Sequence, residues 1–306
     1  MLIMVNLVNF WRVFSYIGTE LCQGTLENFV NNTYKGQDVG SKLEILKQIT
    51  QGLEYLHSNN VVHRDIKPQN ILISFPNGSV PPLMKLTDFG ISRVHREGRS
   101  DLTKTGSSGT LGWIAPEFYD PVFDKYTSQA DIFPLGCIFC YVLSDGNHPF
   151  GDEKDLRQGN IKSGKCNLPT EKLQKFDHAL ELIKAMLDPL PEKRPTAAEI
   201  LKHPFFDSVQ TRQLAASCIS SAASSKKISQ LFDKQLKSEG AVLGKGSFNT
   251  IVCKVQCDQQ ERAIKRIEKL LNDSYINETS FLSSNDFNVA QHVVRYFSCE
   301  YDEHYW

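Results

Sequence analysis

A short polar segment around residue 65 combines side chains that can do acid–base and phosphate chemistry. His63, Arg64, Asp65, Lys67 and Asn70 fall within eight consecutive positions. A carboxylate can accept a proton, an ammonium group can neutralise an anion, and the oxygens of Asp and Asn are suitable ligands for Mg²⁺. Asp65 in isolation would be read as a loop-capping residue, but the set at this spacing favours catalysis.

The elements on either side of this segment are predicted to hold it rigidly. The stretch SKLEILKQITQGLEYLHSNN has apolar residues three and four apart, which is the period of one helix face, and it ends at Ser58-Asn59-Asn60. The stretch VVHRDIKPQNILI then gives an apolar pair, a polar loop and an apolar strand. Loops held by rigid elements are frequent places for catalytic groups.

The composition is typical of a soluble globular protein and excludes some functions. The 306 residues include 34 Lys and Arg against 35 Asp and Glu, so the net charge is −1 and nucleic acid is not an expected partner. No apolar run reaches the roughly 20 residues of a membrane span. Met1–Trp11 is predicted to be a strand rather than a signal peptide. The eight cysteines are scattered, which favours reduced thiols in the cytoplasm.

The chain divides into blocks of different character. Residues 1–22 and 23–206 precede a Ser/Ala-rich stretch, 207–239, that is predicted to be a linker with one short helix at Ile228–Lys237. Residues 240–306 alternate apolar and polar side chains, which indicates a β-meander, then a helix and a further strand.

Two motifs downstream of Asn70 complete a resemblance. Asp88-Phe89-Gly90 follows the strand-like MKLT, and Ala115-Pro116-Glu117 closes a segment rich in Ser and Thr. With the first motif, they resemble the signatures of eukaryotic protein kinases, an α+β bilobal fold. The resemblance implies ATP and Mg²⁺ as cofactors and a protein as substrate. It implies that Asp65 accepts the proton of the substrate hydroxyl, that Lys67 stabilises the phosphate, and that Asn70 and Asp88 hold Mg²⁺. Lys67 is typical of Ser/Thr kinases.

The last block resembles the small lobe of a kinase. Gly244-Lys245-Gly246 is similar to the glycine-rich loop that covers the ATP phosphates, although Asn249 stands where the family has a third glycine. By resemblance, Lys265 contacts the phosphates and pairs with Glu278. Without the resemblance, these two would be a solvated strand lysine and a solvated helix glutamate.

Further positions are assigned by the same resemblance. The adenine ring would contact a hinge and apolar walls, formed by Thr19, Glu20, Cys22, Leu72, Val252 and Ala263. Structural support would come from Asp131, below the catalytic loop, and from an ion pair between Glu117 and Arg194. Phosphorylation of the activation segment, read by Arg64, would involve Thr103, Thr105, Ser107 and Ser108.

Several stretches, among them HRDIKPQNILIS and SGTLGWIAPE, are most similar to the inositol-requiring-enzyme kinases of the unfolded protein response. That family adds a lumenal sensor, a membrane span and a ribonuclease domain. Only 33 residues separate Phe206 from Gly240, too few for a ribonuclease domain, so the RNA-cleaving function is not carried over.

The order of the two lobes is reversed relative to the family, because the glycine-rich loop follows the catalytic loop. The prediction is therefore a circularly permuted kinase, with the helical large lobe first and the β-rich small lobe last. Two halves of tandem kinases, an erroneous gene model, or two chains that exchange lobes in a dimer would also explain the order. A catalytically weak nucleotide-binding regulatory or scaffold module is the alternative function.

Overall fold

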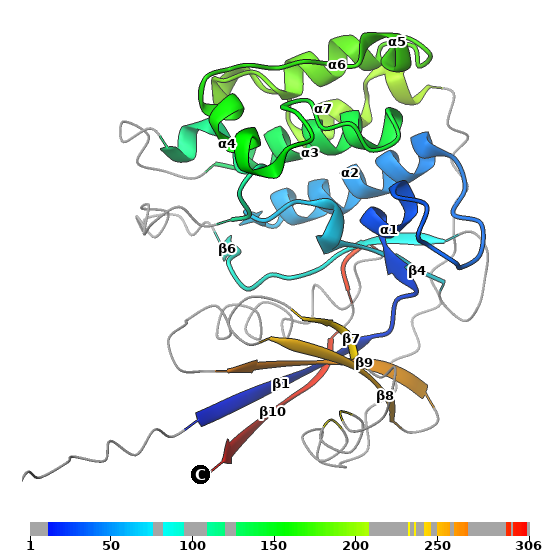
Figure 1. Ribbon diagram of the computed structural model, residues 1–306, viewed down its shortest axis with the longest axis vertical. Coiled ribbons are helices and arrows are strands. Elements are labelled where there is room, and N and C mark those ends of the chain that lie inside the picture. Colours follow the sequence, from blue (N-terminus) through cyan, green and yellow to red (C-terminus); the bar gives the residue numbers. More distant parts are fainter. Residues whose placement is uncertain are drawn as a thin grey trace, which may run out of the picture. The chain divides into compact units, whose positions relative to one another are not determined.

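The computed structural model describes residues 12–75, 82–94, 109–119, 127–207, 232, 236, 242–245, 250–257, 260–268, 292–294 and 296–304. The chain forms two compact units, a sheet unit and a helical unit (Figure 1). The sheet unit comprises Met1–Leu21, Ile219–Ser283 and Arg295–Trp306. The helical unit comprises Cys22–Cys218 and Ser284–Val294.

The helical unit contains short strands with two helices among them, and further helices follow the last strand. Its strands are β2 (Gly24–Thr25), β3 (Val61–Val62), β4 (Ile71–Ser74), β5 (Leu83–Leu86) and β6 (Arg93–Val94). They pair as β2-β4-β5 and as β3-β6. Its α-helices are α1 (Leu26–Val30), α2 (Lys42–Ser58), α3 (Gln129–Leu143), α4 (Lys154–Lys162), α5 (Thr170–Leu173), α6 (Ala179–Met186) and α7 (Ala197–Leu201). Short 3₁₀ turns are η1 (Pro68–Asn70), η3 (Pro116–Tyr119), η4 (Pro191–Lys193) and η5 (Pro204–Phe206).

Two long helices give this unit its core. Helix α2 confirms the predicted helix: the Ser41 side chain caps it by accepting the Glu44 N–H at 3.2 Å, and Leu46, Ile49 and Leu53 are buried. Every residue of α3 from Ala130 to Leu143 is buried. A helix that is apolar on all sides must be surrounded by protein. Helix α3 can therefore hold the loops that contact it in a fixed position.

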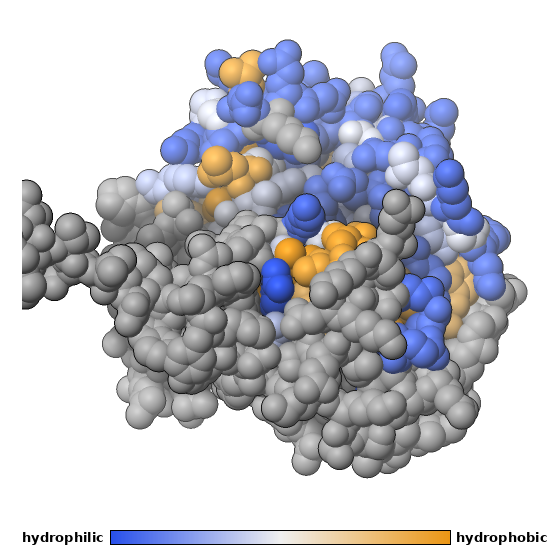
Figure 2. All heavy atoms as spheres, turned by 60° about the horizontal axis from the view of Figure 1, so that its bottom comes forward, coloured by the Kyte–Doolittle hydropathy of each residue, from blue (hydrophilic) through white to orange (hydrophobic). Residues whose placement is uncertain are grey.

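On the face that Figure 2 shows, the described residues are mostly hydrophilic, with hydrophobic patches among them. The large hydrophobic side chains exposed in the described part of the chain are Leu111, Leu156, Leu190, Val242 and Leu243. None of the helices in the same described ranges is both long enough and apolar enough to cross a membrane.

The sheet unit is one antiparallel sheet of five strands in the order β10-β1-β9-β8-β7. These strands are β1 (Arg12–Glu20), β7 (Val242–Lys245), β8 (Ile251–Cys257), β9 (Gln260–Glu268) and β10 (Tyr296–His304). The predicted β-meander is thus present as β7, β8 and β9. The strand predicted at Met1–Trp11 and the helix predicted after residue 270 lie outside the described residues.

One face of this sheet is covered by a segment that the sequence analysis assigned to a linker. Phe232 is helical and fully buried, and its ring lies 5.5 Å from that of Tyr16 in an edge-to-face contact. Leu236, one helical turn later, packs on the same cluster with Cys253 and Ile264. Both residues lie within the short helix predicted at Ile228–Lys237, where side chains four residues apart share one helix face, and that face packs on the sheet.

A further segment of the last block contacts the helical unit. His292–Val294 was assigned to the small lobe with the rest of 240–306, but it packs on the helical unit. Leu86 N–H donates to the His292 carbonyl at 2.8 Å, and Val294 N–H donates to the Leu86 carbonyl at 3.0 Å. Val293 is fully buried. Since β5 is an edge strand of its sheet, its backbone can pair with this distant segment.

This contact predicts a pH dependence of stability. Burial lowers the pKa of His292 to about 4, and the Lys85 charge adds to this, while the hydrogen bond to the Met84 carbonyl opposes it. A folded-state pKa below the unfolded value of about 6.5 means that the neutral form stabilises the fold. The free energy of unfolding should therefore be highest above pH 6.5 and fall by up to ~1.4 kcal/mol per unit towards pH 4.

Denaturant unfolding followed by circular dichroism between pH 4 and pH 8 measures this slope. His292→Asn keeps a neutral donor and should flatten it. The matched control is His178→Asn, since the His178 side chain is half exposed. An unchanged slope in His292→Asn would contradict the prediction.

Candidate active site

The predicted catalytic loop, residues 63–70, is anchored by one buried carboxylate on α3. Asp131 accepts the His63 N–H and the Arg64 N–H, both at 2.8 Å, and its Oδ2 lies 3.0 Å from His57 Nε2. Burial alone would raise the pKa of Asp131, but the hydrogen bond from His57 and the nearby imidazoles outweigh it and lower the pKa. Asp131 therefore fixes the backbone at the position where the loop begins.

Two residues of the site have left-handed backbone conformations. Arg64 has φ +71° and Asp88 has φ +68°. Non-glycine residues adopt this region rarely and at an energetic cost, so the surrounding structure must enforce it. The contacts of Arg64 N–H with Asp131 and of Arg64 Nη1 with the Ile91 carbonyl, at 3.2 Å, do this for Arg64.

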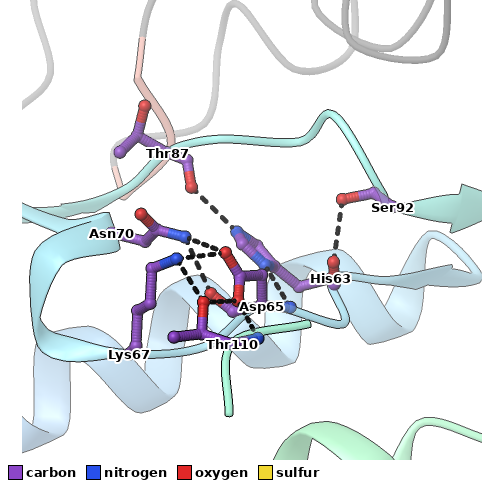
Figure 3. Close-up of polar contacts among 7 residues, drawn as sticks. All are labelled: His63, Asp65, Lys67, Asn70, Thr87, Ser92 and Thr110. Atoms are coloured by element: carbon purple, nitrogen blue, oxygen red, sulfur yellow. Dashed lines mark hydrogen bonds and ion pairs between the residues drawn. The ribbon is translucent and has the colours of Figure 1, made fainter. Parts of the chain in front are cut away.

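The Asp65 carboxylate is the centre of the site (Figure 3). Its Oδ2 accepts from Lys67 Nζ at 2.5 Å and from Asn70 Nδ2 at 2.9 Å. Its Oδ1 accepts from the Thr110 N–H at 3.0 Å and the Thr110 hydroxyl at 2.8 Å. Lys67 also donates to the Thr110 hydroxyl at 2.6 Å. The carboxylate is thereby held in one orientation by donors that complement its charge.

Thr87, the residue before Asp88, links this part of the chain to Asn70 by a backbone hydrogen bond. The Thr87 N–H donates to the Asn70 carbonyl at 3.1 Å, and His63 Nε2 donates to the Thr87 carbonyl at 3.0 Å. Phe89 is fully buried, with its ring 5.0 Å from that of His63. Asp88, next to Thr87, is therefore fixed beside the catalytic loop.

The side chains of Asn70 and Asp88 offer oxygen donors, the ligand type that Mg²⁺ prefers. Asn70 uses its amide nitrogen on Asp65, so its amide oxygen is the atom suited to a cation. Within the described ranges, no group of three or more His, Cys, Asp or Glu side chains could hold a metal by itself. One or two protein oxygens with phosphate oxygens and water are the usual Mg²⁺ ligands at such sites.

The expected ion pair between Glu117 and Arg194 is present and buried. Arg194 Nη1 and Nη2 donate to the two carboxylate oxygens of Glu117 at 2.8 Å and 2.7 Å. Arg194 also donates to the carbonyls of Gln129 and Asp188 at 2.9 Å and 2.7 Å. This side chain thus joins η3, the start of α3 and the loop before η4.

The expected ATP-binding residues of the sheet unit share one face of its sheet. Val252 and Ile17 are both paired with Lys265, and Thr19 is paired with Ala263. Directly paired residues in adjacent strands point to the same side. Thr19, Val252, Ala263 and Lys265 therefore lie on the face opposite the buried Phe232 cluster.

The remaining expected site residues are placed as follows. Gly244 and Lys245 lie in β7 and are exposed, Glu20 ends β1, Cys22 is half-buried, and Leu72 is half-buried in β4. Arg64 is buried. Gly246, Glu278, Thr103, Thr105, Ser107 and Ser108 lie outside the described residues.

Thr110, which together with Gly109 agrees in sequence with the Ser/Thr class of kinases, was not expected to contact Asp65. It makes two of the four hydrogen bonds to Asp65. Its position three residues before Trp113 and shortly before Ala115-Pro116-Glu117 was the available signal, but a lone threonine gives no reason to expect contact with a residue 45 positions earlier.

Comparisons with known proteins show the family to which the chain belongs. A model of the protein kinase domain matches residues 4–206. The human serine/threonine-protein kinase/endoribonuclease IRE2 is 42% identical over 197 residues, covering 63% of this chain and 21% of the relative. The Caenorhabditis elegans serine/threonine-protein kinase/endoribonuclease ire-1 is 36% identical over 248 residues, covering 78% and 25%. The chain thus spans only a fifth to a quarter of the length of these relatives.

Proposed function

We propose that this chain, which belongs to the protein kinase domain family, transfers the γ-phosphate of ATP to Ser and Thr hydroxyls of proteins, its own included. The observation that carries the proposal is the Asp65 carboxylate held by Lys67, Asn70 and Thr110. Lys67 at this position, and its contact with a threonine hydroxyl, support the Ser/Thr class.

Each catalytic side chain then has a defined task. The acceptor oxygen forms a bond to the γ-phosphorus, the bond from that phosphorus to the β–γ bridging oxygen breaks, and ADP leaves. Asp65 orients the acceptor hydroxyl and takes its proton. Lys67 neutralises charge on the moving phosphoryl group, and Asn70 and Asp88 would hold Mg²⁺, which would neutralise further phosphate charge. ATP with Mg²⁺ supplies the activated phosphoryl group.

We assign ATP contacts to Thr19, Val252, Ala263 and Lys265, on the face of the sheet opposite the buried Phe232 cluster, and to further residues by resemblance. Lys265 would bind the α- and β-phosphates and pair with Glu278, and Gly244-Lys245-Gly246 would cover the phosphates. Adenine would contact the hinge and apolar walls, namely Thr19, Glu20, Cys22, Leu72, Val252 and Ala263. Arg64 would read phosphates placed on the activation segment, at Thr103, Thr105, Ser107 or Ser108.

We further propose that the kinase fold is circularly permuted. The support is the pairing of β1, early in the chain, with β9 and β10, late in the chain, within one sheet. Arg12 is paired with His304, so a short turn could join β10 to β1 in a chain of ordinary order. Exchange of these strands between two chains would give the same pairing and a dimer.

The endoribonuclease named in the relatives is not part of this proposal, because the chain matches only a fraction of those proteins. We propose a cytoplasmic kinase with a protein substrate. Five cysteines are free thiols, which supports a reducing compartment; they are Cys22, Cys137, Cys140, Cys166 and Cys253.

The test is a labelling experiment on the purified chain. The protein is incubated with Mg²⁺, γ-labelled ATP and casein, and the label is assigned by phosphoamino-acid analysis. Label on Ser and Thr that disappears when Mg²⁺ is chelated is the expected result. A light-scattering measurement of the same sample shows whether one chain or two form the active species.

Magnesium-dependent ATP binding without phosphate transfer would contradict the proposal. It would favour the alternative, a regulatory or scaffold module that binds nucleotide. Lack of a cooperative unfolding transition would instead indicate pieces of two kinases that do not assemble.

A further inference from the structure

We propose that Gln158, on helix α4, is a positioning residue that holds Thr110 against Asp65; the inference rests on the proposed kinase function. Gln158 Oε1 accepts the Gly112 N–H at 2.7 Å. Both residues are buried, so water does not substitute for either partner. The bond joins α4 to the segment that carries Thr110.

The segment from Gly109 to Trp113 is fixed at both ends. At one end, Thr110 is bound to Asp65 through its N–H and its hydroxyl. At the other, Gly112 is bound to Gln158, only two residues away. Gly109 and Gly112 have φ values of +130° and +86°, and added Cβ atoms would lie 3.0 Å from the Arg64 carbonyl oxygen and 2.8 Å from Arg157 Cδ. The segment therefore has little room to shift while both bonds are made.

Helix α4 makes two further contacts with the same part of the chain. The Arg157 guanidinium lies 5.7 Å from the centre of the Trp113 ring, and Lys162 Nζ lies 4.1 Å from the centre of the Tyr119 ring. Arg157 is in turn held by the Gly151 carbonyl, to which its Nε donates at 2.9 Å. Among these contacts of α4, the hydrogen bond between Gln158 and Gly112 lies nearest to Thr110 in sequence.

Loss of the Gln158 acceptor would leave a buried backbone N–H without a partner. That group can regain a partner only if the segment moves, and movement of Gly112 displaces Thr110. Two of the four hydrogen bonds that orient Asp65 come from Thr110. The chemical step depends on that orientation, whereas ATP does not contact Gln158 in the proposed assignment.

The test compares Gln158→Leu, which cannot accept a hydrogen bond, with Gln158→Glu, which can. Gln174→Leu makes the same chemical change at an exposed position and is the matched control. We expect Gln158→Leu to lower kcat about 10-fold. The KM for ATP, measured by varying the ATP concentration, should not change. Gln158→Glu should stay within about 3-fold of the unmodified chain, and Gln174→Leu should equal it.

Amide hydrogen exchange gives a readout that does not need activity. Exchange at Gly112 and Thr110 should accelerate in Gln158→Leu and remain slow in Gln158→Glu, with the exchange of the α3 amides unchanged in both. Unchanged kcat or unchanged exchange in Gln158→Leu would overturn the inference. Faster exchange across α3 would show general destabilisation and overturn it as well. If the unmodified chain transfers no phosphate, the proposed function fails, while the exchange result still decides the role of Gln158.

Discussion

Asp65→Asn should lower kcat for phosphate transfer by about 10² to 10⁴-fold, the range for loss of a general base. The substitution keeps the shape of the side chain but removes its ability to accept a proton. It also places an NH₂ group among donors, because Lys67, Asn70 and Thr110 all donate to the native carboxylate. Label transfer from γ-labelled ATP measures the effect.

Binding of ATP and overall folding should change little in Asp65→Asn, and equilibrium dialysis with ATP and thermal unfolding check this. Asp177→Asn, at an exposed position, is the matched control and should retain full activity. Transfer by Asp65→Asn within about 3-fold of the unmodified chain would show that Asp65 is not the proton acceptor.

Arg194→Met should destabilise the helical unit by about 3–5 kcal/mol, the cost of leaving a buried charge without its partner. Glu117 and Arg194 are both buried and joined by two hydrogen bonds. Removal of the guanidinium also deprives the Gln129 and Asp188 carbonyls of a donor. Denaturant unfolding at neutral pH, followed by circular dichroism, gives the free energy.

Two further variants show whether the cost comes from the isolated charge. Glu117→Met combined with Arg194→Met removes both charges and should be less destabilising than Arg194→Met alone. Lys254→Met breaks an ion pair with Glu261 whose side chains are about half exposed, and it should cost under about 1 kcal/mol. A cost of Arg194→Met as small as that of Lys254→Met would contradict the prediction.

Much of the local structure could be predicted because it follows from patterns within one element. The apolar face of α2 repeats every three or four residues, and the Ser41 cap and the Ser58-Asn59-Asn60 end are local signals. The strands β8 and β9 follow from alternation of apolar and polar residues. The catalytic loop was recognisable because His63, Asp65, Lys67 and Asn70 lie close together in sequence.

The boundaries of the two units could not be predicted in the same way. Phe232 lies in a Ser/Ala-rich stretch whose composition resembles a linker, yet it is fully buried against Tyr16. Val293 follows residues assigned to the small lobe, yet it pairs with Leu86 in a parallel bridge. Composition averages over a window of sequence, whereas burial of a single side chain depends on what surface lies nearby in the fold.

The sequence by itself determined which chemical groups are present and which of them are neighbours along the chain. Asp65, Lys67 and Asn70 belong to that set. Only the tertiary structure decided that Thr110 bonds to Asp65 and that Gln158 bonds to Gly112, at separations of 45 and 46 residues. These hydrogen bonds depend on how α4 and the catalytic loop pack. No local periodicity encodes packing between elements that are distant in sequence.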